Sequence, residues 1–163
     1  MKNYLIAFLS VVCLISNAQQ PQPLSAVFDS YFAVKDALVK TDGATASAKA
    51  ADLLTAIKAV QMDKLPMDVH TIWMKVLKEL SEDAAHISQT KDASHQREYF
   101  RALSKNMYDL VKASKSGETV YYQFCPMANK GKGANWLSKE SSIKNPYYGS
   151  MMLSCGKVQE TIK

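Results

Sequence analysis

Between residues 23 and 115, hydrophobic side chains recur every three or four positions, the spacing that gives a helix one buried face. Short breaks at 41–43, near Pro66 and at 90–92 divide this pattern into four stripes. The stripes comprise Leu24, Val27, Phe28, Tyr31, Val34 and Leu38; Ala50, Leu53, Leu54, Ile57 and Val60; Val69, Ile72, Trp73, Val76, Leu77, Leu80, Ala84 and Ile87; and Phe100, Leu103, Met107, Leu110 and Val111. Because short connections place consecutive helices antiparallel, the pattern predicts an up-and-down four-helix bundle.

The pattern changes after Ser114, and residues 116–163 contain five of the six glycines. Residues 119–124 alternate as a short extended segment does, and Asn145-Pro146 predicts a turn because a residue before proline avoids the helical region. We expect a loop-rich lid that packs on the bundle through its aromatic side chains. The expected fold class is all-α, with one domain over residues 19–163: a helical bundle at 23–115 and a Cys- and Met-containing C-terminal lid at 116–163.

Residues 1–18 have the features of a secretory signal peptide. Lys2 precedes an apolar stretch, Tyr4 to Ile15, that is too short to cross a bilayer. Ser16-Asn17-Ala18 then places small residues at the two positions that signal peptidase recognises. We therefore expect cleavage near Ala18 and a mature protein in the periplasm.

Composition narrows the classes of protein that fit. Of 163 residues, 21% are charged and 47% hydrophobic, as in ordinary globular proteins, and the net charge of +5 comes with no long basic run. Nothing therefore indicates nucleic-acid binding, and no later apolar stretch is long enough to span a membrane. The sequence contains no Gly-x-Ser-x-Gly, phosphate-binding glycine loop, Cys-x-x-Cys or His-Glu-x-x-His motif, so we expect no enzyme. The oligomeric state stays open.

Two tail segments each combine a thiol with a thioether: Cys125-Pro126-Met127 and Met151-Met152-Leu153-Ser154-Cys155. Thiolate and thioether sulfurs are soft ligands, which suit Cu(I) or Ag(I) better than Mg²⁺ or Ca²⁺. If the tail folds back on itself, the four sulfurs of Cys125, Met127, Met152 and Cys155 would converge on one metal ion.

The same residues admit a second interpretation, which the sequence leaves open. Two cysteines in an exported domain commonly form a disulfide, and closing a loop of this length would stabilise the fold by roughly 3 to 4 kcal/mol. Methionines, in turn, commonly fill gaps in a core. The protein would then be a helical interaction module without metal, stapled by Cys125–Cys155.

Two further features of the sequence have alternative roles. Arg97 would anchor a carboxylate or a helix end, or lie in solvent as an ordinary surface cation. The aromatic side chains of the tail would stack on a ligand or form a small core between lid and bundle, and they comprise Tyr121, Tyr122, Trp136, Tyr147 and Tyr148.

Three stretches of the chain resemble a bacterial periplasmic family, that of domain of unknown function 3347. They are Gln96-Arg97-x-x-Phe100-x-x-Leu103-Ser104; Tyr121-Tyr122-x-x-Cys125-Pro126-Met127-Ala128 with Gly131-Lys132-Gly133-Ala134-x-Trp136-Leu137-Ser138; and Asn145-Pro146-Tyr147-Tyr148-Gly149-Ser150-x-Met152-Leu153-x-Cys155-Gly156. The resemblance implies a helical fold in a protein that occurs alone or fused to periplasmic adaptor subunits of heavy-metal efflux pumps.

That setting implies a role in binding or delivering Cu(I) or Ag(I), with an efflux adaptor or another envelope metal-handling protein as the partner. Carried over position by position, the implied ligands are Cys125, Met127, Met152 and Cys155. Ala128 stands where the metal-binding segment of such adaptors has His, and Phe124 stands where some relatives have His. These departures favour an all-sulfur site.

Overall fold

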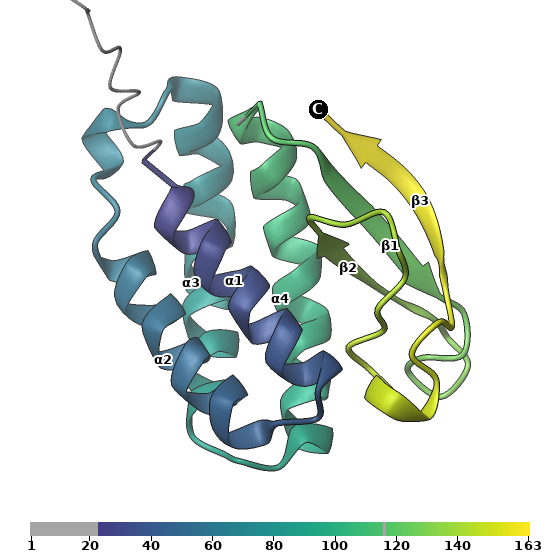
Figure 1. The fold of residues 1–163 in the computed structure, drawn as a ribbon. Helices are drawn as coiled ribbons and strands as arrows, with labels where there is room; N and C mark the ends of the chain where they lie inside the picture. Colours follow the sequence, from purple (N-terminus) through teal and green to yellow (C-terminus); the bar gives the residue numbers. More distant parts are fainter. Residues whose placement is uncertain (1–22, 116) are drawn as a thin grey trace, which may run out of the picture.

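The computed structural model describes residues 23–115 and 117–163, so the predicted signal peptide at 1–18 lies outside the described residues. Four helices account for most of the described residues (Figure 1). They are α1 (Ser25–Val39), α2 (Gly43–Lys58), α3 (Met67–Ser88) and α4 (Ala93–Ser114), with a short 3₁₀ helix, η1 (Met62–Lys64), before α3. No helix among the described residues is both long and apolar enough to cross a membrane.

The helix boundaries follow from local capping and polar breaks. Asp42 caps α2 by accepting the backbone N–H of Thr45 at 2.9 Å, and Asp92 caps α4 by accepting the N–H of Ser94 at 2.8 Å. The buried amide of Gln96 donates to the carbonyls of Gly43 (2.9 Å) and Thr90 (2.7 Å). One side chain of α4 thereby joins the start of α2 to the α3–α4 connection.

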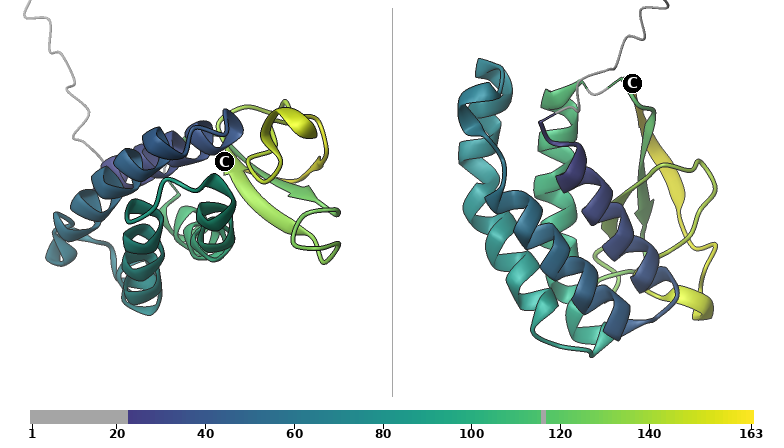
Figure 2. Two further views of the ribbon diagram at one scale, coloured as in Figure 1. Left: turned by 90° about the horizontal axis from the view of Figure 1, so that it is seen from below. Right: turned by 60° about the vertical axis from the view of Figure 1, so that its left-hand side comes forward.

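Consecutive helices run antiparallel and pack on one another in chain order, as the short connections predict (Figure 2). Contacts between α1 and α4 are sparser, and a small sheet lies beside this side of the bundle. The buried side chains form one continuous cluster that includes residues of the helices and of the sheet. The largest fully buried members are Trp73, Trp136, Tyr31, Phe100, Leu38, Leu53, Leu80, Ile87, Leu103, Met107, Leu110 and Leu137.

The all-α prediction is incomplete, because the tail is not only a loop-rich lid. It contains an antiparallel sheet in the order β2-β1-β3, made of β1 (Val120–Cys125), β2 (Ala134–Ser138) and β3 (Lys157–Ile162), and a second 3₁₀ helix, η2 (Gly149–Met151). The alternation at 119–124 correctly predicts β1. Nearly all side chains of β2 are buried, whereas most side chains of β3 are exposed. Neither sequence therefore alternates between apolar and polar residues as that of a half-buried strand does.

Aromatic side chains join this sheet to the bundle, as the sequence predicts. The Tyr31 hydroxyl on α1 accepts the N–H of Leu137 in β2 at 3.0 Å and lies 2.8 Å from the Ser104 hydroxyl on α4. Tyr147 packs against Phe100 and Trp136, with ring centroids 6.0 Å apart in each pair. The tail and the helices therefore share one core.

Asp83 on α3 makes stability depend on pH. Its Oδ2 is buried without a hydrogen-bond partner among the described residues, and burial, with the neighbouring Glu82 and Glu79, raises its pKa to about 6. The folded state thus binds the proton more tightly than the unfolded chain, so the free energy of unfolding falls as pH rises from about 4 to about 6.

We expect Asp83→Asn to raise the free energy of unfolding at pH 7.5 by about 1 kcal/mol and to change it little at pH 4. The value at pH 7.5 is reduced because the site is half-exposed. Urea unfolding at both pH values, with the exposed Asp63→Asn as control, measures this. A gain of equal size at pH 4 would contradict it.

Candidate functional site

The two tail cysteines lie side by side where β1 ends. Cys125 is the last residue of β1, pairs with Ala134 of β2 and is fully buried. Cys155 is half-buried and comes just before β3, which pairs with the other edge of β1. Their Sγ atoms are 2.7 Å apart and are not joined by a disulfide bond in this structure. The tail therefore folds back and brings the two predicted cysteines together.

Buried Asn145 fixes the loop that carries Cys155. Its Nδ2 donates to the carbonyl of Cys155 at 2.9 Å, its backbone N–H donates to the carbonyl of Leu153 at 2.8 Å, and its Oδ1 accepts the N–H of Tyr147 at 2.8 Å. Gly156 lets the chain then pass close to β1, because a Cβ there would lie 2.9 Å from the Phe124 carbonyl oxygen. The position of Cys155 is thus set by its loop as well as by the sheet.

The predicted methionines lie differently. Met127 is 52% exposed and, together with Cys155, lines a shallow surface hollow of about 320 Å³. We call this the sulfur hollow. Its other lining residues are Phe124, Pro126, Gly156 and Lys157. Met152 is half-buried and does not line this hollow, although its carbonyl accepts the N–H of Cys155 at 3.0 Å. The structure therefore gathers Cys125, Cys155 and Met127, and places Met152 next to this group through the backbone.

The thiol of Cys155 holds its proton more strongly than an ordinary cysteine does. The hydrogen bond with Cys125 raises the pKa of Cys155, burial and the nearby Cys125 raise it further, and the backbone N–H of Met127 opposes these effects. At neutral pH Cys155 is therefore mainly in the thiol form. A metal ion that binds there must displace protons, so its affinity will rise with pH.

Nitrogen and carboxylate ligands are not gathered in the same way. Within residues 23–115 and 117–163, no group of three or more His, Cys, Asp or Glu side chains is close enough to hold a metal ion. His86 stacks on Tyr99 with centroids 4.3 Å apart, and His95 lies 3.5 Å from the carboxylate of Glu98. A metal site with three or more protein ligands in this part of the chain would therefore include another kind of donor, such as a thioether.

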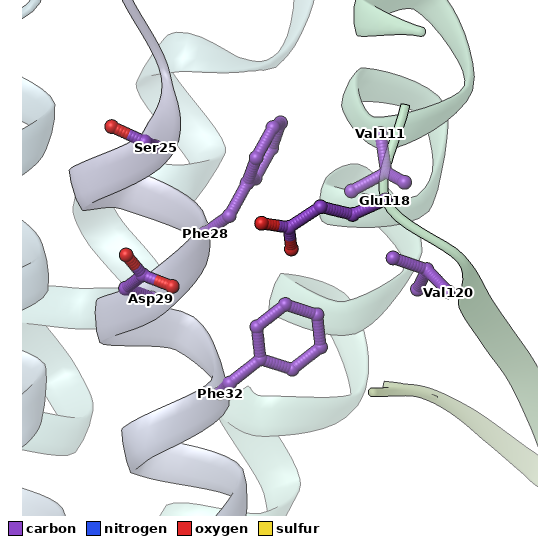
Figure 3. A pocket seen from close by; sticks show the side chains of 7 residues that line it. All are labelled: Ser25, Phe28, Asp29, Phe32, Val111, Glu118 and Val120. Carbon is purple, nitrogen blue, oxygen red and sulfur yellow. The ribbon is translucent and has the colours of Figure 1, made fainter. Parts of the chain in front are cut away.

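A small pocket between α1 and the start of β1 has no counterpart in the sequence analysis. Figure 3 shows the rings of Phe28 and Phe32 on one side and Glu118 on the other. Lys139 reaches Asp29 (2.9 Å) and Glu118 (3.4 Å) and lies over the Phe32 ring. The volume of about 60 Å³ holds little more than water, so we assign this pocket no ligand.

Arg97 anchors a helix end, one of the roles left open by the sequence. Its Nη2 donates to the carbonyl of Leu38 (3.1 Å) and to the hydroxyl of Thr41 (3.0 Å), and its Nε donates to the carbonyl of Pro146 (2.7 Å).

Arg97 also borders a second hollow, of about 280 Å³, between α4 and the tail loops. Sequence reasoning missed this hollow. The recurrence of Ser94, Arg97, Glu98 and Arg101 on one helical face was the available signal.

Fold and site together define a mostly helical protein with a small antiparallel sheet and a pair of adjacent cysteines, one buried and one half-buried. The family model described as "Protein of unknown function (DUF3347)" matches residues 27–119, more than half of the chain, and the chain belongs to this family. The match covers the helices and ends one residue before β1, so all four predicted sulfur ligands lie beyond it. No curated protein and no solved structure matches the chain.

Proposed function

We propose that the chain is an exported, periplasmic protein that binds one Cu(I) or Ag(I) ion in heavy-metal efflux or homeostasis. The observation that carries the proposal is the adjacent pair of cysteines, Cys125 and Cys155, beside the exposed thioether of Met127. Two thiolates and a thioether are a donor set that soft monovalent ions prefer. The role is that of a carrier rather than an enzyme.

The pair must open slightly to accept an ion. Two thiolates bound about 2.3 Å from a tetrahedral metal lie about 3.8 Å apart, compared with 2.7 Å here. Cys125 is held within the sheet, so we assign the movement to Cys155, which lies on the loop before Gly156. Met152 would move together with Cys155, because its carbonyl accepts the backbone N–H of Cys155.

The open side of the sulfur hollow supports transfer of the ion to another protein. Met127 is half in solvent while Cys125 is fully buried, so an acceptor would approach from the Met127 side. The resemblance to chains fused to efflux adaptors supports such an adaptor, or another envelope metal-handling protein, as the acceptor. The signal-peptide features of residues 1–18 support export to the periplasm.

Native mass spectrometry of anaerobically purified protein, with one equivalent of Cu(I), tests the proposal. We expect one bound copper, no bound copper in Cys125→Ser, and an affinity about tenfold weaker in Met127→Leu, a loss of about 1.4 kcal/mol. Met74→Leu is the matched control, because Met74 is 53% exposed, on α3. Equal affinity of the Met127 and Met74 variants would exclude the thioether ligand. Met152→Leu tests the fourth sulfur in the same way.

The second candidate is the interaction module without metal, and the 2.7 Å separation specifically favours it. This distance is closer to the 2.05 Å of a disulfide than to the separation of two thiolates on one ion. Thiol counting on denatured protein purified from the periplasm separates the two candidates. Two titratable thiols support the metal carrier, whereas none supports a permanent disulfide.

A further inference from the structure

The hollow beside Arg97 is built from two distant parts of the chain. One wall is a face of α4 bearing Ser94, Arg97, Glu98 and Arg101, and the other is formed by the loops that carry Lys130 and Tyr148. Hydrogen bonds hold the walls together, since Arg101 Nη1 donates to Asn129 Oδ1 at 2.6 Å and Arg97 Nε donates to the Pro146 carbonyl. We call this the cationic hollow.

Its positive charge exceeds its negative charge, because Arg97, Arg101 and Lys130 face a single lining carboxylate, that of Glu98. Arg97, Arg101 and Lys130 form no ion pair with any described residue, and every hydrogen-bond partner of the two guanidinium groups is a neutral oxygen. The sole carboxylate lining the hollow, Glu98, lies 3.5 Å from His95. Arg97 is half-buried, which strengthens the field of its charge inside the hollow.

Donors also remain for a ligand. The Nη1 of Arg97 and the Nη2 of Arg101 make no hydrogen bond to described residues, whereas Arg97 is held through Nε and Nη2 and Arg101 through Nη1. Fixed guanidinium forks match the two oxygens of a carboxylate or phosphate. The volume of about 280 Å³ suits a small ion rather than a drug-sized molecule.

We propose that the cationic hollow binds a small dianion, a dicarboxylate or a phosphate, between Arg97, Arg101 and Lys130. Tyr148 contributes the apolar edge of the site; its hydroxyl is already occupied, because it donates to the Met127 carbonyl at 2.7 Å. This binding does not require a metal ion in the sulfur hollow.

Isothermal titration calorimetry of the full mature chain with succinate and with inorganic phosphate tests the proposal. We expect saturable one-site binding of at least one anion, weakened at least tenfold in Arg101→Gln/Lys130→Gln. The matched control is Lys105→Gln/Lys132→Gln, which removes the same charge from exposed lysines on α4 and the same loop that do not line the hollow. We expect less than a twofold change in this control. Arg97 is left intact because it anchors the loops.

The two anions distinguish the source of the ligand. Tighter succinate binding indicates a carboxylate ligand and tighter phosphate binding indicates a phosphate, and either result supports the site. Equal weakening in both double variants would overturn it, because the attraction would then come from net charge alone. Lack of saturable binding of both anions below 10 mM, in protein whose circular dichroism matches that of a folded helical chain, would also overturn it.

Discussion

Replacing Gly149 by Ala is expected to lower the free energy of unfolding by about 3 kcal/mol. Gly149 begins η2 with φ at +56°, where an L side chain costs roughly 1 to 2 kcal/mol. A Cβ there would lie 2.3 Å from the Thr41 hydroxyl, 3.0 Å from the Val39 carbonyl oxygen and 3.1 Å from Nη2 of Arg97. These atoms belong to the end of α1 and its anchor, so the loop must move away, at a further cost of about 1 to 3 kcal/mol.

Gly131→Ala is the matched control for this variant. Gly131 has φ at +81°, but a Cβ there would meet nothing within 4 Å, so only the backbone strain of roughly 1 to 2 kcal/mol remains. Urea unfolding of the two variants therefore separates packing from strain. Equal losses would mean that η2 does not pack against the end of α1 as the structure describes.

Oxidation of Cys125 and Cys155 to a disulfide is expected to raise the free energy of unfolding by roughly 3 to 4 kcal/mol. The bond would close a loop of about thirty residues, and the lost entropy of the unfolded chain gives this magnitude. Closing it requires little movement, because the sulfurs are already 2.7 Å apart. The measurement is urea unfolding of the oxidised protein with and without a reductant.

Cys155→Ser is the control for this experiment, since residue 155 is half-buried and the change leaves the buried Cys125 in place. Its stability should equal that of the reduced protein and should not respond to the reductant. Unchanged stability on reduction, with thiols that titrate afterwards, would contradict the expected staple. The metal proposal is unaffected by this outcome, because it requires the reduced pair.

The helices were predictable because hydrophobic spacing and breaks agree along residues 23–115. The break at 41–43, for example, predicts the end of α1, which falls at Val39. Strand β1 was predictable for the same reason, since it alternates. Strands β2 and β3 were not predictable from such a pattern. Strand β2 is buried on both faces and β3 is largely exposed on both faces, so neither alternates between apolar and polar residues.

The candidate site was predictable in its residues and not in its geometry. Thiol and thioether positions are visible in the sequence, but the path of the loop that returns Cys155 to Cys125 depends on the contacts of Asn145 and on the close approach at Gly156. The cationic hollow was missed for a related reason. Arg101 and Lys130 lie far apart in the chain, and only the packing of the 127–134 loop on α4 brings them to one hollow.

The position of Tyr31 has a practical consequence for where this chain can be divided. Its fully buried ring and hydroxyl connect α1, α4 and β2, so the helices depend on a strand more than a hundred positions away in sequence. A fragment that stops at residue 119, where the family match ends, would uncover the stacked rings of Phe100 and Tyr31 and remove the Leu137 N–H that the Tyr31 hydroxyl accepts. The segment by which the family is recognised is therefore shorter than the unit that must be expressed to obtain a folded protein.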